Sequence, residues 1–418
     1  MAQRKVINLD HISKDVSVNK WLIISLIGLI LFFPPSLPYL FNASSMALGI
    51  VTIAMFAVLL RTFGVVSVPY NNRLVNEMTI AILAVFAVLA HLFIASLIRP
   101  IDVNRAIQSL GVLVLFIGAA PLVSRIIFVP KADMKPDILC WLFLVFALLS
   151  VIGVQPPTQS DGAKPTFPFT EPSFFAFTLM PILVFQCVSS SWTKRLLWLL
   201  AFLIFGVIVK NLTVVTACGL VALVSLPLRL AIPFLAVVIL IANGVDTTYF
   251  EERLDISVDS ANISALVYAQ GWQLLEEANK STKGWGVGFQ QLGFGYTNVP
   301  ASYRIFYLLK RDSNLIDGGF LLSKAGSEFG VLGLVFIGII TTNAGRCFLL
   351  LRSYAMGNRQ FDPATVLALS SCYAIVLEIY VRGANYFTGT VFLATMSAFF
   401  LFRNRANIRL FKSGSGAA

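Results

Sequence analysis

The sequence predicts an all-α protein that crosses a membrane about 12 times. Of its 418 residues, 57% are hydrophobic and 12% are charged, whereas about a quarter of the residues in a soluble domain are charged. The apolar residues form long runs, and Arg and Lys gather in the short polar segments between them. Only the segment 244–317 is long, polar and internal. These three observations predict a polytopic membrane protein with one large insert outside the membrane.

Twelve apolar runs are the predicted membrane spans. Several are shorter than the roughly 20 residues that a straight crossing needs, so the expected number ranges from about 11 to 14. The transmembrane domain covers residues 21–402, between a polar tail at 1–20 and a second tail at 403–418, whose final SGSGAA resembles a tag remnant. The runs are 21–35, 45–60, 75–98, 106–129, 138–154, 173–188, 196–209, 212–226, 232–242, 318–341, 364–381 and 389–402.

The distribution of basic residues predicts the orientation of these spans. Arg and Lys crowd both ends of the chain and the loops after the second, fourth, sixth, eighth and tenth runs. The positive-inside rule places these loops and both termini in the cytoplasm. The insert 244–317 and a Pro-rich loop at 155–172 then share the outer side. Because topology explains much of the formal net charge of +11, the charge does not predict a nucleic-acid partner.

Cysteine and histidine usage gives little sign of covalent or metal chemistry. All five cysteines lie in apolar runs, so we expect no disulfide framework, no metal site and no cofactor. His91 lies inside a predicted span, where we expect it to hydrogen-bond a neighbouring helix.

The Pro-rich loop ends at Glu171, directly before a predicted span. Pro172 suits the first helical turn, because backbone N–H groups in that turn make no bond within the helix and Pro lacks one. A carboxylate at a helix N-terminus is stabilised by the helix dipole. Glu171 is therefore either a simple N-terminal carboxylate, or a base or hydroxyl-orienting group at the outer membrane surface.

The insert contains a predicted helix and a glycine-rich turn. Residues 266–275 combine Trp272 with apolar side chains, which favours a helix at the membrane interface. The run GWGVG at 284–288 follows no strand, so it indicates a tight turn or a close approach to a ligand rather than a dinucleotide site. Asp317 closes the insert before the next span. Three arginines of the insert are candidate anion ligands: Arg253, Arg304 and Arg311.

Two pairs of opposite charge stand four residues apart in late spans. These are Lys324 with Glu328 and Glu378 with Arg382. This spacing puts both partners on one helix face, so we expect each to form an ion pair. Arg382 and Lys210 also lie in outward turns. With the arginines of the insert, they are expected to converge on one anion, because Arg binds phosphate oxygens in a bidentate fashion.

Taken together, these features resemble the Wzy-type O-antigen polymerases, which are related to the O-antigen ligases. The resemblance lies in about twelve spans, an outward Pro-rich loop that ends in Glu-Pro-Ser, and a late outer loop in which a Trp-bearing helix leads into GWGVGF. SNLIDGGFLLSKAGSEFGVLGL follows at 313–334, with an E-x-G near the start of the next span. The ligase branch has a histidine just before that span. Here Asp312 and Asp317 stand there instead, which argues against a ligase.

The resemblance implies a GT-C-like glycosyltransferase architecture in a bacterial inner membrane, with its active site facing the periplasm. It implies a metal-independent polymerase that joins oligosaccharide repeat units carried on undecaprenyl pyrophosphate. Glu171 or Asp317 would take or orient the acceptor proton. The implied partners are that lipid-linked oligosaccharide, membrane lipids and a co-polymerase that sets chain length. The residues implied to hold the pyrophosphate are Arg253, Arg304, Arg311, Arg382 and Lys210.

Two other functions stay open. One is an O-antigen ligase that transfers finished polymer to the lipid A core. The other is a transporter or flippase for lipid-linked sugars. Transporters often show internal repeats and broken polar helices at the membrane midplane. This sequence has no convincing repeat, and its charges gather at the outer surface, which favours the polymerase.

Overall fold

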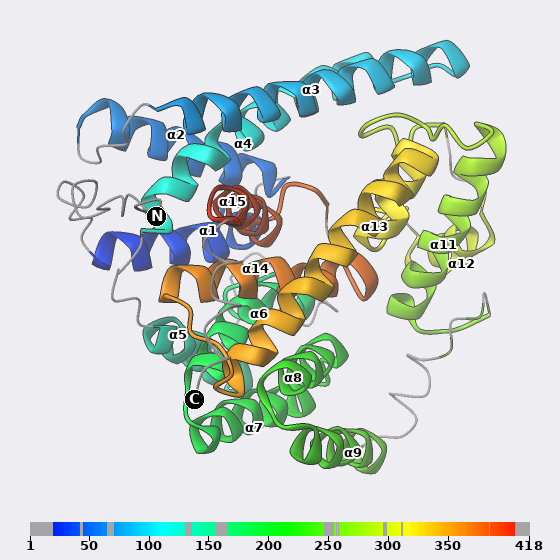
Figure 1. The fold of residues 1–418 in the computed structure, drawn as a ribbon. Helices are drawn as coiled ribbons and strands as arrows, with labels where there is room; N and C mark the ends of the chain where they lie inside the picture. The colour runs from blue at the N-terminus through cyan, green and yellow to red at the C-terminus, as the bar shows by residue number, and fades with distance from the viewer. Residues whose placement is uncertain are drawn as a thin grey trace, which may run out of the picture.

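A computed structural model describes residues 20–41, 45–64, 71–129, 136–154, 166–245, 255, 257, 259–295, 299–310, 312–383 and 385–405. Within these ranges the chain forms fourteen helices and no β-strand, which confirms the all-α class (Figure 1). The helices are α1 (Lys20–Phe41), α2 (Ala47–Thr62), α3 (Asn72–Ile98), α4 (Val103–Ile127), α5 (Pro136–Val151), α6 (Pro172–Ser189), α7 (Trp192–Ile208), α8 (Leu212–Ser225), α9 (Leu228–Val245), α11 (Ile263–Ser281), α12 (Pro300–Leu309), α13 (Leu321–Ala355), α14 (Pro363–Tyr380) and α15 (Gly389–Arg403).

The helices have the length and composition of a multi-pass membrane protein. Among the described residues, α1, α3, α4, α6, α13 and α14 are six helices long and apolar enough to cross a membrane. Shorter apolar helices accompany them: α2, α5, α8, α9 and α15. Each of the twelve predicted runs coincides with one helix among α1–α9 and α13–α15. Twelve complete crossings, the GT-C-like architecture and the side that each end faces stay predictions.

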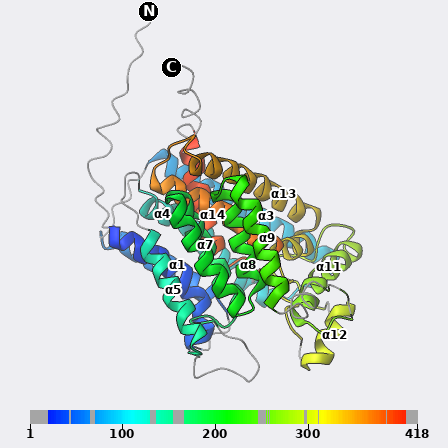
Figure 2. The same ribbon diagram turned by 90° about the horizontal axis from the view of Figure 1, so that it is seen from below.

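The loops predicted to face outward gather at one end of the helix bundle, which we call the insert end. Here the Arg99 guanidinium donates to the carbonyl of Phe294 at 2.7 Å. The side chain of Asn211 donates to the carbonyl of Pro172 at 2.7 Å. Helices α11 and α12 lie at this end beside the start of α13, away from the centre of the bundle (Figure 2). The α3–α4, α5–α6 and α7–α8 loops therefore share one end with the insert.

Helix α6 lies at the centre of the bundle. Fifteen of its 18 residues are buried, and it packs against α14, α8, α5 and α7. A helix that is apolar on every side is stable only when neighbours surround it, which agrees with this position. Its N-cap is Glu171. The most enclosed helix of the bundle thus fixes the backbone of the predicted functional carboxylate.

Buried ionic contacts close the opposite end of the bundle. Glu77 is 2% exposed and contacts Arg125 at 3.0 Å and Arg403 at 3.2 Å. This triad joins α3, α4 and α15. Arg195 of α7 also donates to the carbonyl of Ala355 at the end of α13, at 2.9 Å. A buried charge is tolerated only when it is paired or fully hydrogen-bonded, and these contacts meet that need.

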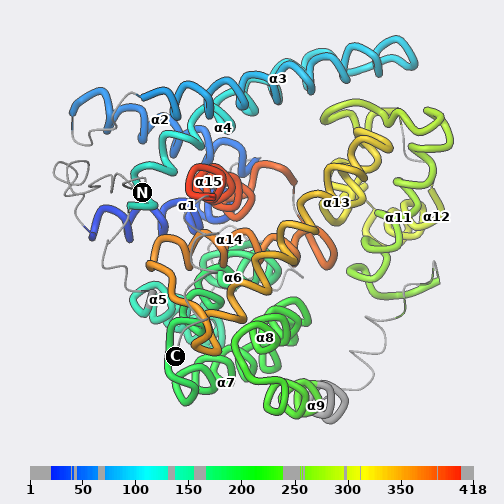
Figure 3. The backbone as a smooth tube through the Cα atoms, in the orientation of Figure 1, coloured from blue at the N-terminus to red at the C-terminus, as the bar shows by residue number. Residues whose placement is uncertain are grey.

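The helix at the predicted span 318–341 is longer than the predicted run and is interrupted. Helix α13 covers 35 residues, from Leu321 to Ala355, and is broken at Gly330, which has φ of +60°. The break removes helical partners from nearby backbone groups, and the glycine-rich turn of the insert replaces them. Val287 and Gly288 donate to the carbonyls of Ser327 and Glu328 at 2.9 and 2.8 Å. The N–H of Val331 donates to the carbonyl of Gly284 at 2.9 Å. Figure 3 shows α13 running from the insert into the bundle.

His91 secures the same turn. Its Nε2 lies 2.8 Å from the carbonyl oxygen of Trp285. The ring also lies 4.9 Å from the ring of Phe329, centroid to centroid. The expectation of a bond between two helices was therefore wrong, because the hydrogen-bond partner belongs to the glycine-rich turn. His91 is itself buried, and this contact gives one of its two ring nitrogens a hydrogen-bond partner.

The break at Gly330 generates a stability prediction. A Cβ at position 330 would lie 1.9 Å from the carbonyl oxygen of Gly284. We expect Gly330→Ala to reduce the yield of monodisperse protein in detergent and to lower its unfolding temperature. Gly338→Ala is the matched control, because nothing lies within 4 Å of a Cβ there and the helix gains up to about 1 kcal/mol in propensity. Equal behaviour of the two variants would contradict the role of the break.

Candidate functional site

A group of ionisable side chains lies at the insert end, and we call it the charged cluster. Its members come from the first turn of α4, the N-cap of α6, the loop before α13, α13 itself and the α14–α15 turn. Glu171, Asp317 and Arg382 were predicted as site residues, whereas Arg105 was not. The six members are Arg105, Glu171, Asp317, Lys324, Glu328 and Arg382.

Arg382 forms an ion pair with Glu171. Arg382 Nη2 lies 3.5 Å from Glu171 Oε2, and the Ser173 hydroxyl donates to the same oxygen at 3.1 Å. The Glu171 side chain remains 46% exposed, so a substrate can reach it. Arg382 Nη1 is a buried donor with no acceptor among the described residues. The pair therefore offers an accessible carboxylate beside a cation with unused hydrogen-bonding capacity.

The predicted pair between Glu378 and Arg382 is wrong. Helix α14 ends at Tyr380, so the four-residue helical spacing does not reach Arg382. Glu378 is buried and instead accepts from the hydroxyl of Thr388 at 3.1 and 3.2 Å. The turn frees Arg382 to contact Glu171 on another element.

Asp317 lies among the charges of the cluster. Burial raises the pKa of Asp317, and the nearby Glu171 raises it further, while Lys324, Arg382 and Arg105 lower it. The net direction is upward. A carboxyl whose pKa rises toward the working pH is better suited to proton transfer than an ordinary surface aspartate.

The backbone around Asp317 is fixed on two sides. A Cβ at Gly271 of α11 would lie 2.4 Å from the carbonyl oxygen of Gly318, so α11 and this loop approach too closely for any larger residue. Gly319, at φ of +79°, accepts from the N–H of Gly383 at 2.9 Å. Gly383 directly follows Arg382. The two glycines after Asp317 thus bring its loop against the α14–α15 turn, which explains why the charge of Arg382 acts on Asp317.

The predicted pair between Lys324 and Glu328 is confirmed. The two charged groups are 3.2 Å apart, and both side chains are fully buried. The pair does more than neutralise itself, because the Lys324 ammonium also donates to the carbonyl of Ile316, next to Asp317. Glu328 Oε2 accepts from the backbone N–H of Gln290 at 2.9 Å. The pair therefore connects α13 to both the Asp317 loop and the glycine-rich turn.

The other predicted anion ligands differ in their position relative to the charged cluster. Lys210 lies in the α7–α8 turn, next to Asn211, which binds the Pro172 carbonyl, so this turn adjoins Glu171. Arg304 lies on α12, with its guanidinium 5.9 Å from the ring centroid of Tyr307. In the described part of the chain, Arg304 has no hydrogen bond or ion pair with the charged cluster. Arg253 and Arg311 lie outside the described residues.

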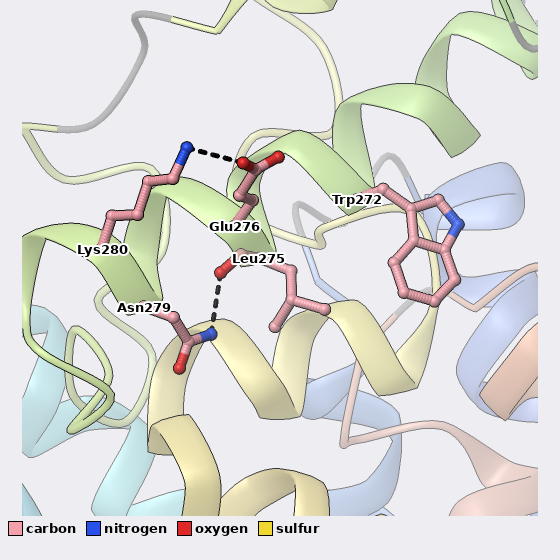
Figure 4. Close-up of a pocket in the computed structure, with 5 residues that line it drawn as sticks. All are labelled: Trp272, Leu275, Glu276, Asn279 and Lys280. Carbon is pink, nitrogen blue, oxygen red and sulfur yellow. Dashed lines mark hydrogen bonds and ion pairs between the residues drawn. The ribbon is translucent and has the colours of Figure 1, made fainter.

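The insert contains more helix than predicted. The run at 266–275 is part of α11, which extends from Ile263 to Ser281, and α12 follows as a second, unpredicted helix. A pocket on α11 is lined by Trp272, Leu275, Glu276, Asn279 and Lys280 (Figure 4). Its only charged lining residues are Lys280 and Glu276, which pair with each other at 2.6 Å. No member of the charged cluster lines this pocket, so the two features are separate.

The buried pair in α13 generates a second stability prediction. Lys324→Met leaves the Glu328 carboxylate buried without its partner, and removal of one member of a buried ion pair typically destabilises a protein by about 3–5 kcal/mol. We expect a clear fall in the unfolding temperature of the purified protein. Lys280→Met also removes a lysine from a pair four residues apart, but that pair is exposed, and we expect no measurable change. The same loss in both variants would contradict the role of the buried pair.

No family model matches the chain, and no curated protein matches it. The charged cluster and the short motifs that resemble the polymerases are therefore the basis of the function proposed below.

Proposed function

We propose that this protein is a polysaccharide polymerase that joins lipid-linked oligosaccharide repeat units at the periplasmic face of a bacterial inner membrane. One observation carries the proposal: Glu171, Asp317 and Arg382, from three separate segments, converge at the insert end of an apolar helix bundle. Carboxylates beside cations at a membrane surface suit the transfer of a sugar from a diphosphate carrier. The donor is the growing glycan on undecaprenyl pyrophosphate, and the acceptor is an incoming repeat unit.

The cationic side of the site binds the diphosphate. Arg382 keeps one buried guanidinium nitrogen for an acceptor outside the described protein. The N-cap of α13 is Phe320, whose side chain makes no capping hydrogen bond, so the first N–H groups of this helix add positive potential. Charge-assisted hydrogen bonds of this kind are stronger than neutral ones. They stabilise the negative charge that develops on the diphosphate as it leaves.

The two carboxylates bind the acceptor hydroxyl, and one of them accepts its proton. Its hydroxyl oxygen attacks the anomeric carbon of the donor sugar while the bond from that carbon to the diphosphate oxygen breaks. Undecaprenyl pyrophosphate leaves with the bonding electrons, and the hydroxyl proton passes to Asp317. Glu171 orients Arg382 through their ion pair, and the exposed carboxylate of Glu171 contacts the acceptor. The raised pKa of Asp317 supports its assignment as the base.

Replacement of the paired residues tests this function in cells. In a Gram-negative host that lacks the endogenous protein, we expect Arg382→Ala and Glu171→Gln to reduce the lipopolysaccharide ladder to core plus one repeat unit. Loss of one such electrostatic contact typically slows transfer about 100-fold or more. Gel electrophoresis of lipopolysaccharide reads the result, with membrane protein levels measured in parallel. Lys280→Ala, on the separate α11 pocket, should restore the full ladder.

Two outcomes of that experiment would contradict the proposal. A normal ladder from Arg382→Ala and Glu171→Gln would remove the charged cluster from the reaction. Bare core without any repeat unit in the deletion strain would instead indicate a ligase or a flippase, because a polymerase is not needed to attach the first unit.

The pKa of Asp317 gives a pH prediction for the purified protein acting on a lipid-linked repeat unit. Below its raised pKa, Asp317 is protonated and cannot accept the hydroxyl proton. Activity should therefore rise as the pH rises through a midpoint above the ordinary aspartate value of about 3.9. Asp317→Asn should abolish this rise along with most activity, whereas Asp312→Asn, an exposed neighbour, should leave the profile unchanged. An unchanged profile in Asp317→Asn would exclude Asp317 as the base.

A further inference from the structure

Arg105, in the first turn of α4, takes no part in the reaction described above. The side chain of Asp102 caps this helix by accepting from the N–H of Arg105 at 3.0 Å. Gln291 of the insert holds the same residue by two bonds, because its side chain accepts from the Asp102 N–H at 2.7 Å and donates to the Asp102 carbonyl at 3.2 Å. The start of α4 is therefore fixed to the insert.

The Arg105 guanidinium binds a residue that borders the loop that carries Asp317. Its Nη1 donates to the carbonyl of Leu292 at 3.0 Å. Leu292 in turn touches that loop, since a Cβ on Gly318 would lie 3.0 Å from Leu292 Cδ2. Arg105 also lowers the pKa of Asp317, as a cation near a carboxylate does. Arg105 thus binds beside the Asp317 loop at Leu292, while Arg382 precedes Gly383, which bonds Gly319 of the same loop.

One nitrogen of Arg105 remains for another acceptor. Among the described residues, Arg105 Nη2 is buried and has no hydrogen-bond partner. A buried guanidinium N–H without an acceptor costs free energy, so proteins seldom keep one without a use. The same is true of Arg382 Nη1. Two unused guanidinium nitrogens therefore belong to arginines whose charges both act on Asp317.

We infer that Arg105 is a second anion-binding residue of the charged cluster and donates from Nη2 to one phosphate of a diphosphate while Arg382 binds the other. The choice of a lipid diphosphate as the ligand rests on the proposed function, whereas the choice of Arg105 rests on the contacts described above. A diphosphate has two phosphates with separate oxygen atoms, which suits two arginines on different elements. The planar fork of Arg allows Arg105 to hold the Leu292 carbonyl and a phosphate at once, and a lysine cannot reproduce that geometry.

Arg99 is a matched control in the same α3–α4 loop. It also donates from its guanidinium to a carbonyl of the insert, that of Phe294. If Arg105 served only to tether the loop, Arg105→Lys and Arg99→Lys would have similar effects. The two variants keep the same net charge, so a difference between them reports the geometry of the guanidinium rather than charge.

The test measures binding of farnesyl diphosphate to the purified full-length protein through the shift of its unfolding temperature. We expect wild type and Arg99→Lys to respond at similar farnesyl diphosphate concentrations. Arg105→Lys should need a concentration at least about tenfold higher, because it loses one charge-assisted hydrogen bond. Farnesyl monophosphate should bind more weakly to wild type and should discriminate less between the variants. Arg105→Gln, which keeps a donor for Leu292, replaces Arg105→Lys if the latter does not fold.

The outcomes separate this inference from the proposed function. Equal binding by Arg105→Lys and Arg99→Lys would overturn the role of Arg105 while leaving the diphosphate site intact. Failure of wild type to bind farnesyl diphosphate would overturn the diphosphate site altogether, and the inference with it. A response of Arg105→Lys only at about tenfold higher farnesyl diphosphate concentration, with a normal unfolding temperature before ligand is added, is the supporting result.

Discussion

The break in α13 is the constraint on which the rest of the insert end depends. Backbone groups freed inside an apolar bundle must find partners within the protein, because lipid offers none. The turn at residues 284–288 supplies those partners, and Gly286 and Gly330 allow the two backbones to touch: a Cβ on Gly286 would lie 2.4 Å from the Gly330 nitrogen. This backbone contact fixes the insert against the helix bundle. It also sets the position of the first segment of α13, which carries Lys324 and Glu328.

The charged cluster follows from that contact. Lys324 reaches back to the carbonyl of Ile316 and so holds the loop of Asp317, while Gly383 bonds the same loop and brings Arg382 beside it. Glu171 comes from the N-cap of α6, the most enclosed helix. Lys324 and Glu328 stand on a buried segment of α13, and Glu171 stands at the N-cap of α6. Asp317 and Arg382 lie in two loops that the bond from Gly383 to Gly319 joins. This arrangement gives the proposed transfer reaction a preorganised set of charges.

Much of the fold was predictable, because apolar runs and basic loops are direct consequences of a membrane environment. The site was predictable only in part. Glu171 and Asp317 stand at boundaries between polar and apolar segments, which the sequence displays. The partner of Arg382 was not predictable, since it depends on where α14 ends, and a four-residue spacing pointed to Glu378 instead. Arg105 was missed because the role inferred for it depends on its bond to the Leu292 carbonyl, nearly two hundred residues later in the chain.

A cryo-electron microscopy structure of the protein with a polyprenyl diphosphate would show where the diphosphate binds. We expect density for the diphosphate at the insert end, with a phosphate oxygen within hydrogen-bonding distance of Arg382 and close to Asp317. Diphosphate density elsewhere, for example in the α11 pocket between Trp272 and Lys280, with the ion pair between Glu171 and Arg382 undisturbed, would contradict it.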